Sequence, residues 1–199
     1  MATGPTGSTM PTNHVLPAWD TATGLTAAVG LLAAERYRQR TGIGQLSKIS
    51  LTDVAFAMVA NLGYMAQAQL TKEDRVPVGN DLYGAFGRDF ATKDDRRIMV
   101  VAISKRQWQS LAEATNIVGH LPSIEEALGV DLSKEGDRWD ARDAIASFMA
   151  PFIESHDLDE IAEIAEIFDA TGVCWGPYQA FVQLVNEDRR ATPENPMFR

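Results

Sequence analysis

The hydrophobic positions that follow Trp19 recur at intervals of three and four residues. They are Leu25, Ala28, Val29, Leu32, Ala33 and Tyr37. This spacing is the stripe of a helix that buries one face, and it predicts a helix over residues 20–39. Asp20 is a preferred residue type for the N-cap of this helix, and Thr41-Gly42 supplies the glycine that commonly ends a helix in a left-handed conformation.

Residues 46–50 change to an alternating pattern, which predicts a short strand. Thr52-Asp53 then begins a second apolar helix, which we extend to about residue 67. One strand leaves its backbone groups unpaired, so we expect its neighbours to come from sequence beyond this chain or from another protomer. The opening residues 1–13 are rich in Gly, Pro, Ser and Thr, and we expect a loop there.

A charged segment that also contains proline and glycine follows the second helix, and it has the composition of a solvated connection. We therefore place a linker at residues 69–81. It separates a first domain at 1–68 from a second domain at 82–186, and residues 187–199 form an irregular tail.

The second domain begins with two strand patterns, Tyr83–Ala91 and Arg97–Ile103, whose polar connection predicts a hairpin. A further short strand is expected at 173–175. The helical patterns that follow the hairpin cover residues 105–114, 124–128, 138–154, 158–170 and 178–186. The chain is therefore expected to have a mixed α/β fold.

Composition narrows the class of protein. The chain has 199 residues, 45% of them hydrophobic and 23% charged, which is ordinary for a soluble protein with one sizeable core or two small ones. No run approaches the roughly 18 apolar residues of a membrane span, and the N-terminus lacks the pattern of a signal peptide, so we expect a cytoplasmic protein with no membrane partner. The net charge of -9 argues against a nucleic-acid partner.

The residues that usually bind metals or phosphates give little signal. Cys174 is the single cysteine, and His14, His120 and His156 lie far apart in the sequence, so we expect no metal site. From its neighbours Val173 and Trp175, Cys174 is expected to be a buried small hydrophobe. No glycine-rich phosphate motif of the Walker or dinucleotide type occurs.

Asp20 has a structural and a chemical interpretation. As an N-cap it would satisfy backbone amides, and the positive end of the helix would lower the pKa of its carboxyl group. A carboxylate held in this way is also an available nucleophile toward an activated acyl group, and the helix start offers N–H groups for an oxyanion. The two roles are compatible.

The glycine-containing stretch around Tyr83 is the second candidate. Gly79, Asn80, Tyr83 and Gly84 allow close approach of the backbone to a ligand, and they equally suit a turn that leads into the hairpin. His14, six residues before Asp20, is either a base or a solvated loop histidine.

Three stretches carry a resemblance to a known family. They are Asp20-Thr21-Ala22-Thr23-Gly24 with its Ala- and Leu-rich helix, Arg40-Thr41-Gly42-Ile43-Gly44-Gln45, and Gly172-Val173-Cys174-Trp175-Gly176-Pro177. In this order they resemble class III CoA-transferases. The amino-acid sequences of residues 13–20, 83–90 and 195–198 are most similar to those of family members that act on a short branched unsaturated dicarboxylic acid.

The resemblance implies an enzyme with Asp20 as the catalytic nucleophile, which forms an aspartyl-CoA intermediate and moves CoA between two carboxylates. It implies an acyl-CoA substrate, no bound cofactor, a homodimer in the complete protein, and a substrate-covering loop at Gly79–Gly87. A racemase, an intermolecular CoA transferase and a non-catalytic module without a complete CoA site remain alternatives.

The resemblance also implies an architecture. Family members are about twice as long as this chain, and an N-terminal doubly wound half supplies most of their CoA contacts. Residues 1–68 would then be part of this large doubly wound domain, with its order of long helix, strand and helix. Residues 82–186 would form the smaller α+β domain.

Overall fold

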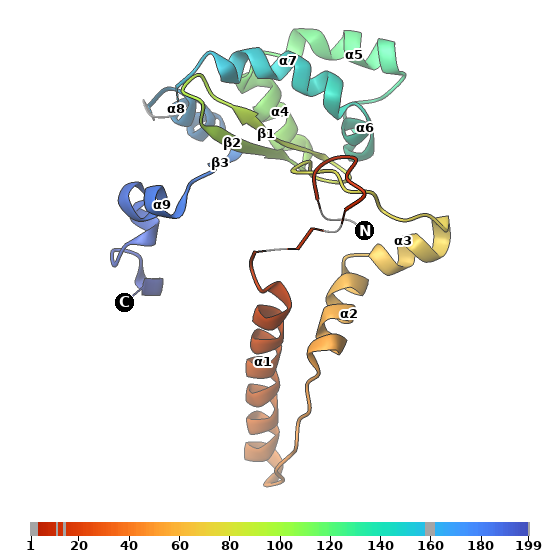
Figure 1. Cartoon of the computed structure of the whole chain (residues 1–199), viewed down its shortest axis with the longest axis vertical. Coiled ribbons are helices and arrows are strands. Elements are labelled where there is room, and N and C mark those ends of the chain that lie inside the picture. Colours follow the sequence, from red (N-terminus) through yellow and green to blue (C-terminus); the bar gives the residue numbers. More distant parts are fainter. Residues whose placement is uncertain (1–3, 11, 14, 158–161, 199) are drawn as a thin grey trace. The chain divides into compact units, whose positions relative to one another are not determined.

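The computed structural model describes residues 4–10, 12–13, 15–157 and 162–198. The chain divides into two compact units, Met1–Gly79 and Asn80–Arg199, which are coloured red to yellow and yellow to blue in Figure 1. The division falls inside the segment 69–81, where the sequence predicts a linker. None of the described helices has the length and apolar character that crossing a membrane requires.

The first unit begins with the long helix α1 (Ala18–Thr41). Pro17, and not Asp20, occupies its N-cap position, so the predicted N-cap role of Asp20 is wrong. The proline ring fixes φ at -73°, and the helix starts directly after it, which leaves Asp20 within the first turn. The predicted C-terminal glycine is confirmed: Gly42 has a φ of 75° and donates its N–H to the carbonyl oxygen of Arg38 at 2.8 Å.

The strand predicted at 46–50 is absent. Residues 43–50 run without regular secondary structure between α1 and the next helix, and every described strand belongs to the second unit. A strand exists only through pairing with a neighbour, and the described residues of the first unit supply none. The alternating sequence therefore indicates a capacity for pairing that this unit does not use.

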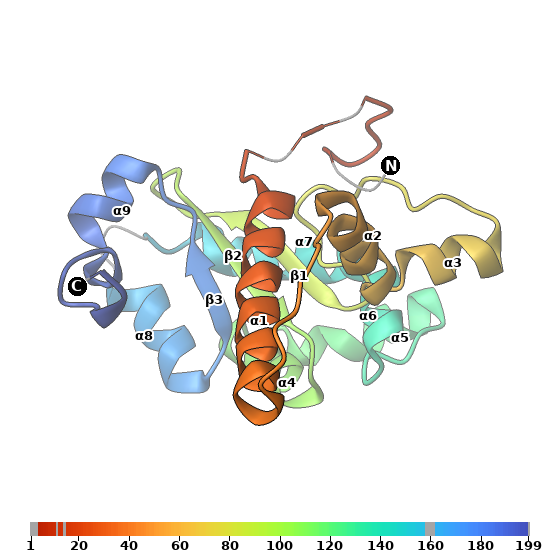
Figure 2. The ribbon, with the colours of Figure 1, turned by 90° about the horizontal axis from the view of Figure 1, so that it is seen from below.

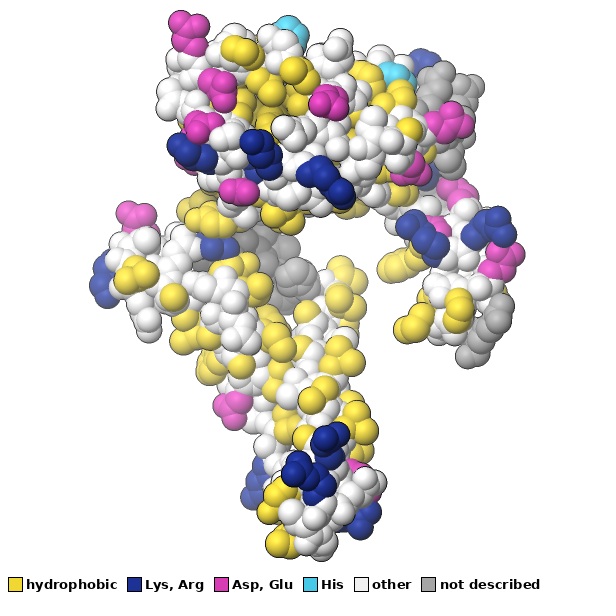
Figure 3. Space-filling view, turned by 180° about the vertical axis from the view of Figure 1, so that it is seen from behind, with side chains coloured by type: hydrophobic (Ala, Val, Ile, Leu, Met, Phe, Trp, Pro, Cys, Tyr) yellow, Lys and Arg dark blue, Asp and Glu magenta, His cyan; other side chains and the backbone are white. Residues whose placement is uncertain are grey.

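The second predicted helix is two helices, α2 (Leu51–Asn61) and α3 (Tyr64–Thr71). Ser50 caps α2 by accepting the N–H of Asp53 at 3.3 Å, so the helix begins at Leu51, one residue before the Thr52-Asp53 start that we predicted. Gly63, with a φ of 79°, separates the helices, because this left-handed conformation interrupts the α-helical path. No residue of α1 is buried, and apolar side chains remain exposed along α1 and α2 (Figure 3).

The second unit contains an antiparallel sheet of β1 (Phe86–Ala91), β2 (Arg97–Ala102) and β3 (Cys174–Pro177), in that order. The predicted hairpin is confirmed, with Phe86 opposite Ala102. β3, predicted at 173–175, pairs with β2 and places Trp175 opposite Val100.

The helices of this unit lie at the predicted positions. They are α4 (Lys105–Ala114), α5 (Leu121–Leu128), α6 (Glu135–Asp140), α7 (Arg142–Glu154), α8 (Ala162–Thr171) and α9 (Phe181–Glu187). Helices α5 and α6 begin three residues earlier and α9 three residues later than predicted. The single helix expected at 138–154 is divided at Ala141, and the first four residues of the one expected at 158–170 lie outside the described residues. Short 3-10 turns occupy Val118–His120 and, in the tail, Arg189–Ala191 and Pro196–Phe198.

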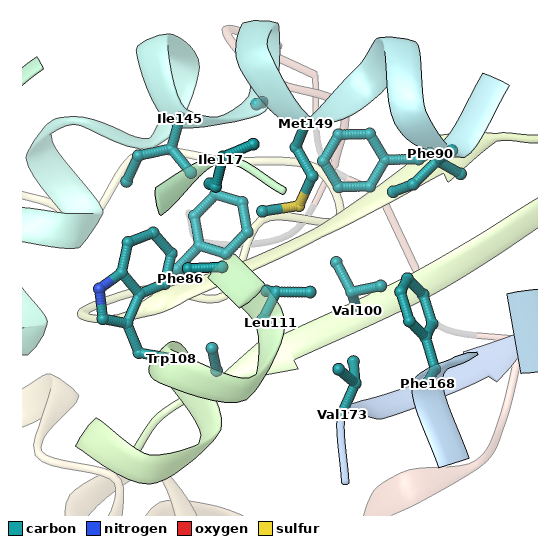
Figure 4. Packing of buried hydrophobic residues seen from close by; sticks show 14 of the residues in the cluster. Phe86, Phe90, Val100, Trp108, Leu111, Ile117, Ile145, Met149, Phe168 and Val173 are labelled. Atoms are coloured by element: carbon teal, nitrogen blue, oxygen red, sulfur yellow. The ribbon is translucent and has the colours of Figure 1, made fainter. Parts of the chain in front are cut away.

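The core of the second unit lies between the sheet and helices α4, α7 and α8, and α4 and α7 pack on β2 and β1 (Figure 2). Figure 4 shows Phe86 of β1 and Val100 of β2 directed at Leu111 of α4 and Met149 of α7. Strand β2 buries alternate residues, Ile98, Val100 and Ala102, on this face, as the period of two requires. The two units together give the mixed helix-and-sheet fold that the sequence predicts.

Candidate active site around Asp20

Asp20 lies at the edge of a hollow of about 570 Å³ within the first unit. Its walls come from the segment before α1, from the first turn of α1, and from the junction of α2 and α3. The lining residues are Thr12, Asn13, Leu16, Pro17, Ala18, Trp19, Asp20, Val59, Leu62 and Tyr64. The break at Gly63 turns the chain here, so that α2 and α3 both contribute to the wall.

The Asp20 carboxylate is exposed, and it makes no hydrogen bond or ion pair with any described residue. The backbone at this helix start is only partly satisfied. Thr21 donates its amide to the carbonyl of Pro17 at 3.0 Å, whereas the amides of Trp19 and Asp20 have no acceptor within the described part of the chain. An exposed carboxylate can attack an acyl carbon, and the unpaired N–H groups beside it can donate hydrogen bonds to the resulting oxyanion.

The other predicted residues are distributed between the units. His14 lies outside the described residues. Gly79 belongs to the first unit, where its φ is 63° and its amide donates to the carbonyl of Gly4 at 3.1 Å. Tyr83 and Gly84 lie in the second unit, in the turn before β1.

The turn before β1 has an exposed tip and a fixed base. Gly84 has a φ of 82°, a conformation that favours glycine. The half-exposed ring of Tyr83 packs on Trp139, with ring centroids 5.0 Å apart, and Asn80 lines a separate hollow beside Arg97. Tyr83 and Gly84 therefore lie in a turn that leads into β1, as one of the two sequence interpretations predicts.

Asp81 is the residue in this turn that sequence reasoning missed. Its buried carboxylate accepts two hydrogen bonds from Arg88, and Arg142 approaches it at 3.3 Å. Arg88 also donates to Asp143 at 2.7 Å, and the guanidinium of Arg142 lies 4.0 Å from the centre of the Trp139 ring. The spacing in the sequence gives no signal for these contacts, because Arg142 is 61 residues away from Asp81.

The guanidinium groups of Arg88 and Arg142 both bind the carboxylate of Asp81. The hydrogen bond to Asp81 raises the pKa of Arg88 above its ordinary value, while desolvation acts in the opposite direction. Arg88 is therefore a permanent cation that holds the turn against β1 and α7.

Cys174 is exposed, so the expectation of a buried residue is wrong. It occupies β3 on the opposite side from Val173 and Trp175, and its sulfur accepts a hydrogen bond from Gln107 at 3.0 Å. The described residues contain no group of three or more histidine, cysteine, aspartate or glutamate side chains that is arranged to hold a metal ion.

Comparison with known proteins identifies the family of this chain. The model of CoA-transferase family III matches residues 1–195. The chain belongs to CoA-transferase family III. It is 44% identical over 196 residues to a 2-methylfumaryl-CoA isomerase from Chloroflexus aurantiacus. This match covers 98% of the chain and 47% of the relative.

Solved structures share the fold of this chain. A CAIB/BAIF family protein from Brucella suis matches 94% of the chain with a TM-score of 0.60 at 19% identity. The hypothetical protein Rv3272 from Mycobacterium tuberculosis matches 93% of it with a TM-score of 0.65 at 21% identity. Each match covers 46% of the solved chain, so the family III chain spans about half the length of its relatives. The resemblance that the sequence motifs indicate is confirmed.

Proposed function

We propose that this chain supplies the nucleophile, Asp20, of an enzyme that moves CoA between the two carboxylates of a short branched unsaturated dicarboxylic acid. The observation that carries the proposal is the exposed Asp20 carboxylate, which has no partner among the described residues and lies beside unpaired amides at the edge of a hollow. Family membership and the 44% identity to a 2-methylfumaryl-CoA isomerase support this substrate class.

In the first step, a carboxylate oxygen of Asp20 attacks the thioester carbonyl of the acyl-CoA. The carbon–sulfur bond breaks, the CoA thiolate leaves, and a mixed anhydride remains between Asp20 and the acyl group. The thiolate then attacks the aspartyl carbonyl of this anhydride. The products of that attack are an aspartyl-CoA thioester and the free carboxylate of the dicarboxylic acid.

In the second half, the other carboxylate of the same acid attacks the aspartyl-CoA carbonyl and releases the thiolate again. Attack of the thiolate on the acyl carbonyl of the new anhydride transfers CoA to the other end of the acid and regenerates Asp20. Every step exchanges a carboxylate for a thiolate or the reverse, so no proton transfer and no bound cofactor is required. The amides of Trp19 and Asp20 are suited to stabilise the tetrahedral oxyanions.

The proposal includes the wider organisation that the family implies. Residues 1–68 are assigned to the large doubly wound domain, 69–81 to a linker, 82–186 to the small domain and 187–199 to a tail. Acyl-CoA is the substrate, the complete protein is a cytoplasmic homodimer, and the turn with Asn80, Tyr83 and Gly84 covers the substrate. His14 and Gly79 are assigned to the same substrate site.

The test is to incubate the protein with 2-methylfumaryl-CoA, trap with hydroxylamine or borohydride, and locate the modification by peptide mass spectrometry. We expect modification at Asp20, loss of it in Asp20→Asn, and retention in Asp53→Asn, which changes another first-turn aspartate. Unmodified Asp20 in protein that binds the substrate would refute the assignment. Deuterium uptake at the α-carbon without CoA movement would favour a racemase. Transfer of CoA only to an added carboxylic acid would favour an intermolecular CoA transferase. Absence of any CoA binding would favour a non-catalytic module.

A further inference from the structure

Tyr64 contributes to the wall of the hollow that contains Asp20. It is the first residue of α3, directly after the left-handed Gly63. Its ring is half-buried, and its hydroxyl group makes no hydrogen bond with any residue that the structure describes. A phenol can donate one hydrogen bond, so this group is available to a molecule that enters the hollow.

The ring of Tyr64 is held by a cation on its face. The guanidinium of Arg75 lies over the ring, 4.2 Å from its centre. Nε of Arg75 donates to Oε1 of Gln67 at 3.0 Å, and Nη2 donates to the same oxygen. Gln67 lies three residues after Tyr64, so the two side chains are neighbours on one face of α3. The orientation of the ring is therefore fixed by contacts on α3 and on the segment that follows it.

The hollow offers few polar groups to a charged ligand. Much of its lining is apolar: Leu16, Trp19, Val59 and Leu62. A carboxylate that enters such a site loses bound water, and this costs free energy unless a hydrogen-bond donor replaces the water. The volume of about 570 Å³ is in the range of small-molecule sites. A short acyl group with a second carboxylate therefore requires a donor from the wall.

We propose that Tyr64 contacts the substrate and selects acyl-CoA molecules that carry a second carboxylate. Its hydroxyl group donates a hydrogen bond to the carboxylate that is not bound to CoA, while the thioester carbonyl faces Asp20. A hydrogen bond to a charged acceptor is stronger than one between neutral groups, so this contact discriminates against acyl groups without the charge. Arg75 is a positioning residue that holds the ring. The inference rests on the proposed function, because that function places the acyl group in this hollow.

A structural role does not account for the hydroxyl group. Phenylalanine at position 64 would present the same ring face to Arg75 and fill the same part of the wall. No described residue loses a hydrogen bond in Tyr64→Phe, so this variant should fold as the parent does, which circular dichroism checks. The substitution therefore isolates the hydroxyl group.

Calorimetric titration of the full chain with two ligands tests the contact. 2-Methylfumaryl-CoA carries a second carboxylate, and 2-methylbut-2-enoyl-CoA has a methyl group in its place. We expect the parent to bind the first ligand at least about tenfold more tightly, and Tyr64→Phe to remove most of this preference. Tyr37→Phe is the matched control, because Tyr37 lies about 25 Å further along α1 than Asp20, and it should keep the preference of the parent.

Tyrosine labelled with carbon-13 at Cζ gives a direct record of the contact. The NMR resonance of Tyr64, assigned by its loss in Tyr64→Phe, should shift when 2-methylfumaryl-CoA saturates the protein. It should shift less with 2-methylbut-2-enoyl-CoA, because that ligand has no acceptor for the hydroxyl group. The resonance of Tyr37 should stay in place with both ligands.

Variants of Arg75 test its positioning role. Arg75→Ala should lower the preference for 2-methylfumaryl-CoA about threefold or more, because the ring loses the group that holds it. Arg75→Lys keeps a cation over the ring and should recover part of the preference. Combining Arg75→Ala with Tyr64→Phe should lower the preference no further than Tyr64→Phe alone, because Arg75 acts through the hydroxyl group.

The inference would be overturned by a parent protein that does not distinguish the two ligands, or by a preference that Tyr64→Phe leaves unchanged. These outcomes are separable from the failure of the proposed function. Trapping that marks Asp20 while Tyr64→Phe keeps the preference would refute only the role of Tyr64. A preference that is lost in Tyr64→Phe while Asp20 stays unmodified would refute only the catalytic assignment. Binding of neither ligand would refute both.

Discussion

The carboxylate of Asp81 accepts two hydrogen bonds from the guanidinium of Arg88, from Nε at 2.6 Å and from Nη2 at 2.7 Å. This bidentate pair joins the turn before β1 to the strand itself. The side chain of Asp81 is 8% exposed, so solvent screens the pair only weakly. The turn that carries Tyr83 and Gly84 therefore has a fixed base although its tip is exposed.

Substitution of Asp81 should destabilise the second unit. Asp81→Asn removes the charge that two guanidinium groups share, and we expect a loss of about 2 kcal/mol in the free energy of unfolding, measured in urea. Asp143→Asn is the matched control, because Asp143 also binds Arg88 but is 75% exposed, and we expect a loss below about 1 kcal/mol. Equal effects of the two substitutions would contradict the special role of the buried carboxylate.

Gly87 is expected to be a packing position. A Cβ at Gly87 would lie 2.7 Å from Cβ of Leu82 and 3.3 Å from the carbonyl oxygen of Val100, so the turn and the sheet would have to separate. Gly87→Ala should therefore cost about 1–3 kcal/mol in thermal or urea unfolding. Gly176→Ala on β3 is the control, since nothing lies within 4 Å of its added Cβ. A Gly87→Ala protein as stable as the parent would show that the contact relaxes without cost.

Arg138 is a fully buried cation that is held by backbone carbonyls. Its guanidinium donates to the carbonyl of Leu132 at 3.0 Å and to that of Ile103 at 2.7 Å, and burial lowers its pKa below the ordinary value. Arg138→Ala leaves these acceptors unpaired and opens a cavity, so we expect a loss of about 3 kcal/mol in urea unfolding. Arg138→Met should lose less because it fills the space. Arg106→Ala, at an exposed position, should be nearly neutral.

The tail contains a carboxyl group whose titration can be measured. Hydrogen bonds from the side chain and backbone of Arg190 lower the pKa of Asp188 from 3.8 to about 2. A lowered folded-state pKa means that the stabilising contact is present above pH 3.8 and is lost as the pH falls toward 2. Carboxyl NMR should give a midpoint near 2, and Arg190→Ala should move it upward. An unchanged midpoint in that variant would exclude Arg190 as the cause.

The sequence by itself determined the elements whose signals are local. Helix α4 has the predicted bounds, because Ser104 and Gln107 form a capping box at its start. Gly42 ends α1 as expected, since only the local backbone conformation matters there. Three local motifs in order, which begin at Asp20, Arg40 and Gly172, indicated the family.

The tertiary structure decided the features that depend on contacts between distant residues. It showed that Cys174 is exposed, because burial depends on which face of β3 meets the helices. It joined Asp81 to Arg142, which no spacing in the sequence could reveal. It gave residues 44–49 no strand partner among the described residues, despite their alternating pattern. Alternation gives a segment the capacity to pair, whereas a strand requires a neighbour whose position the local sequence does not specify.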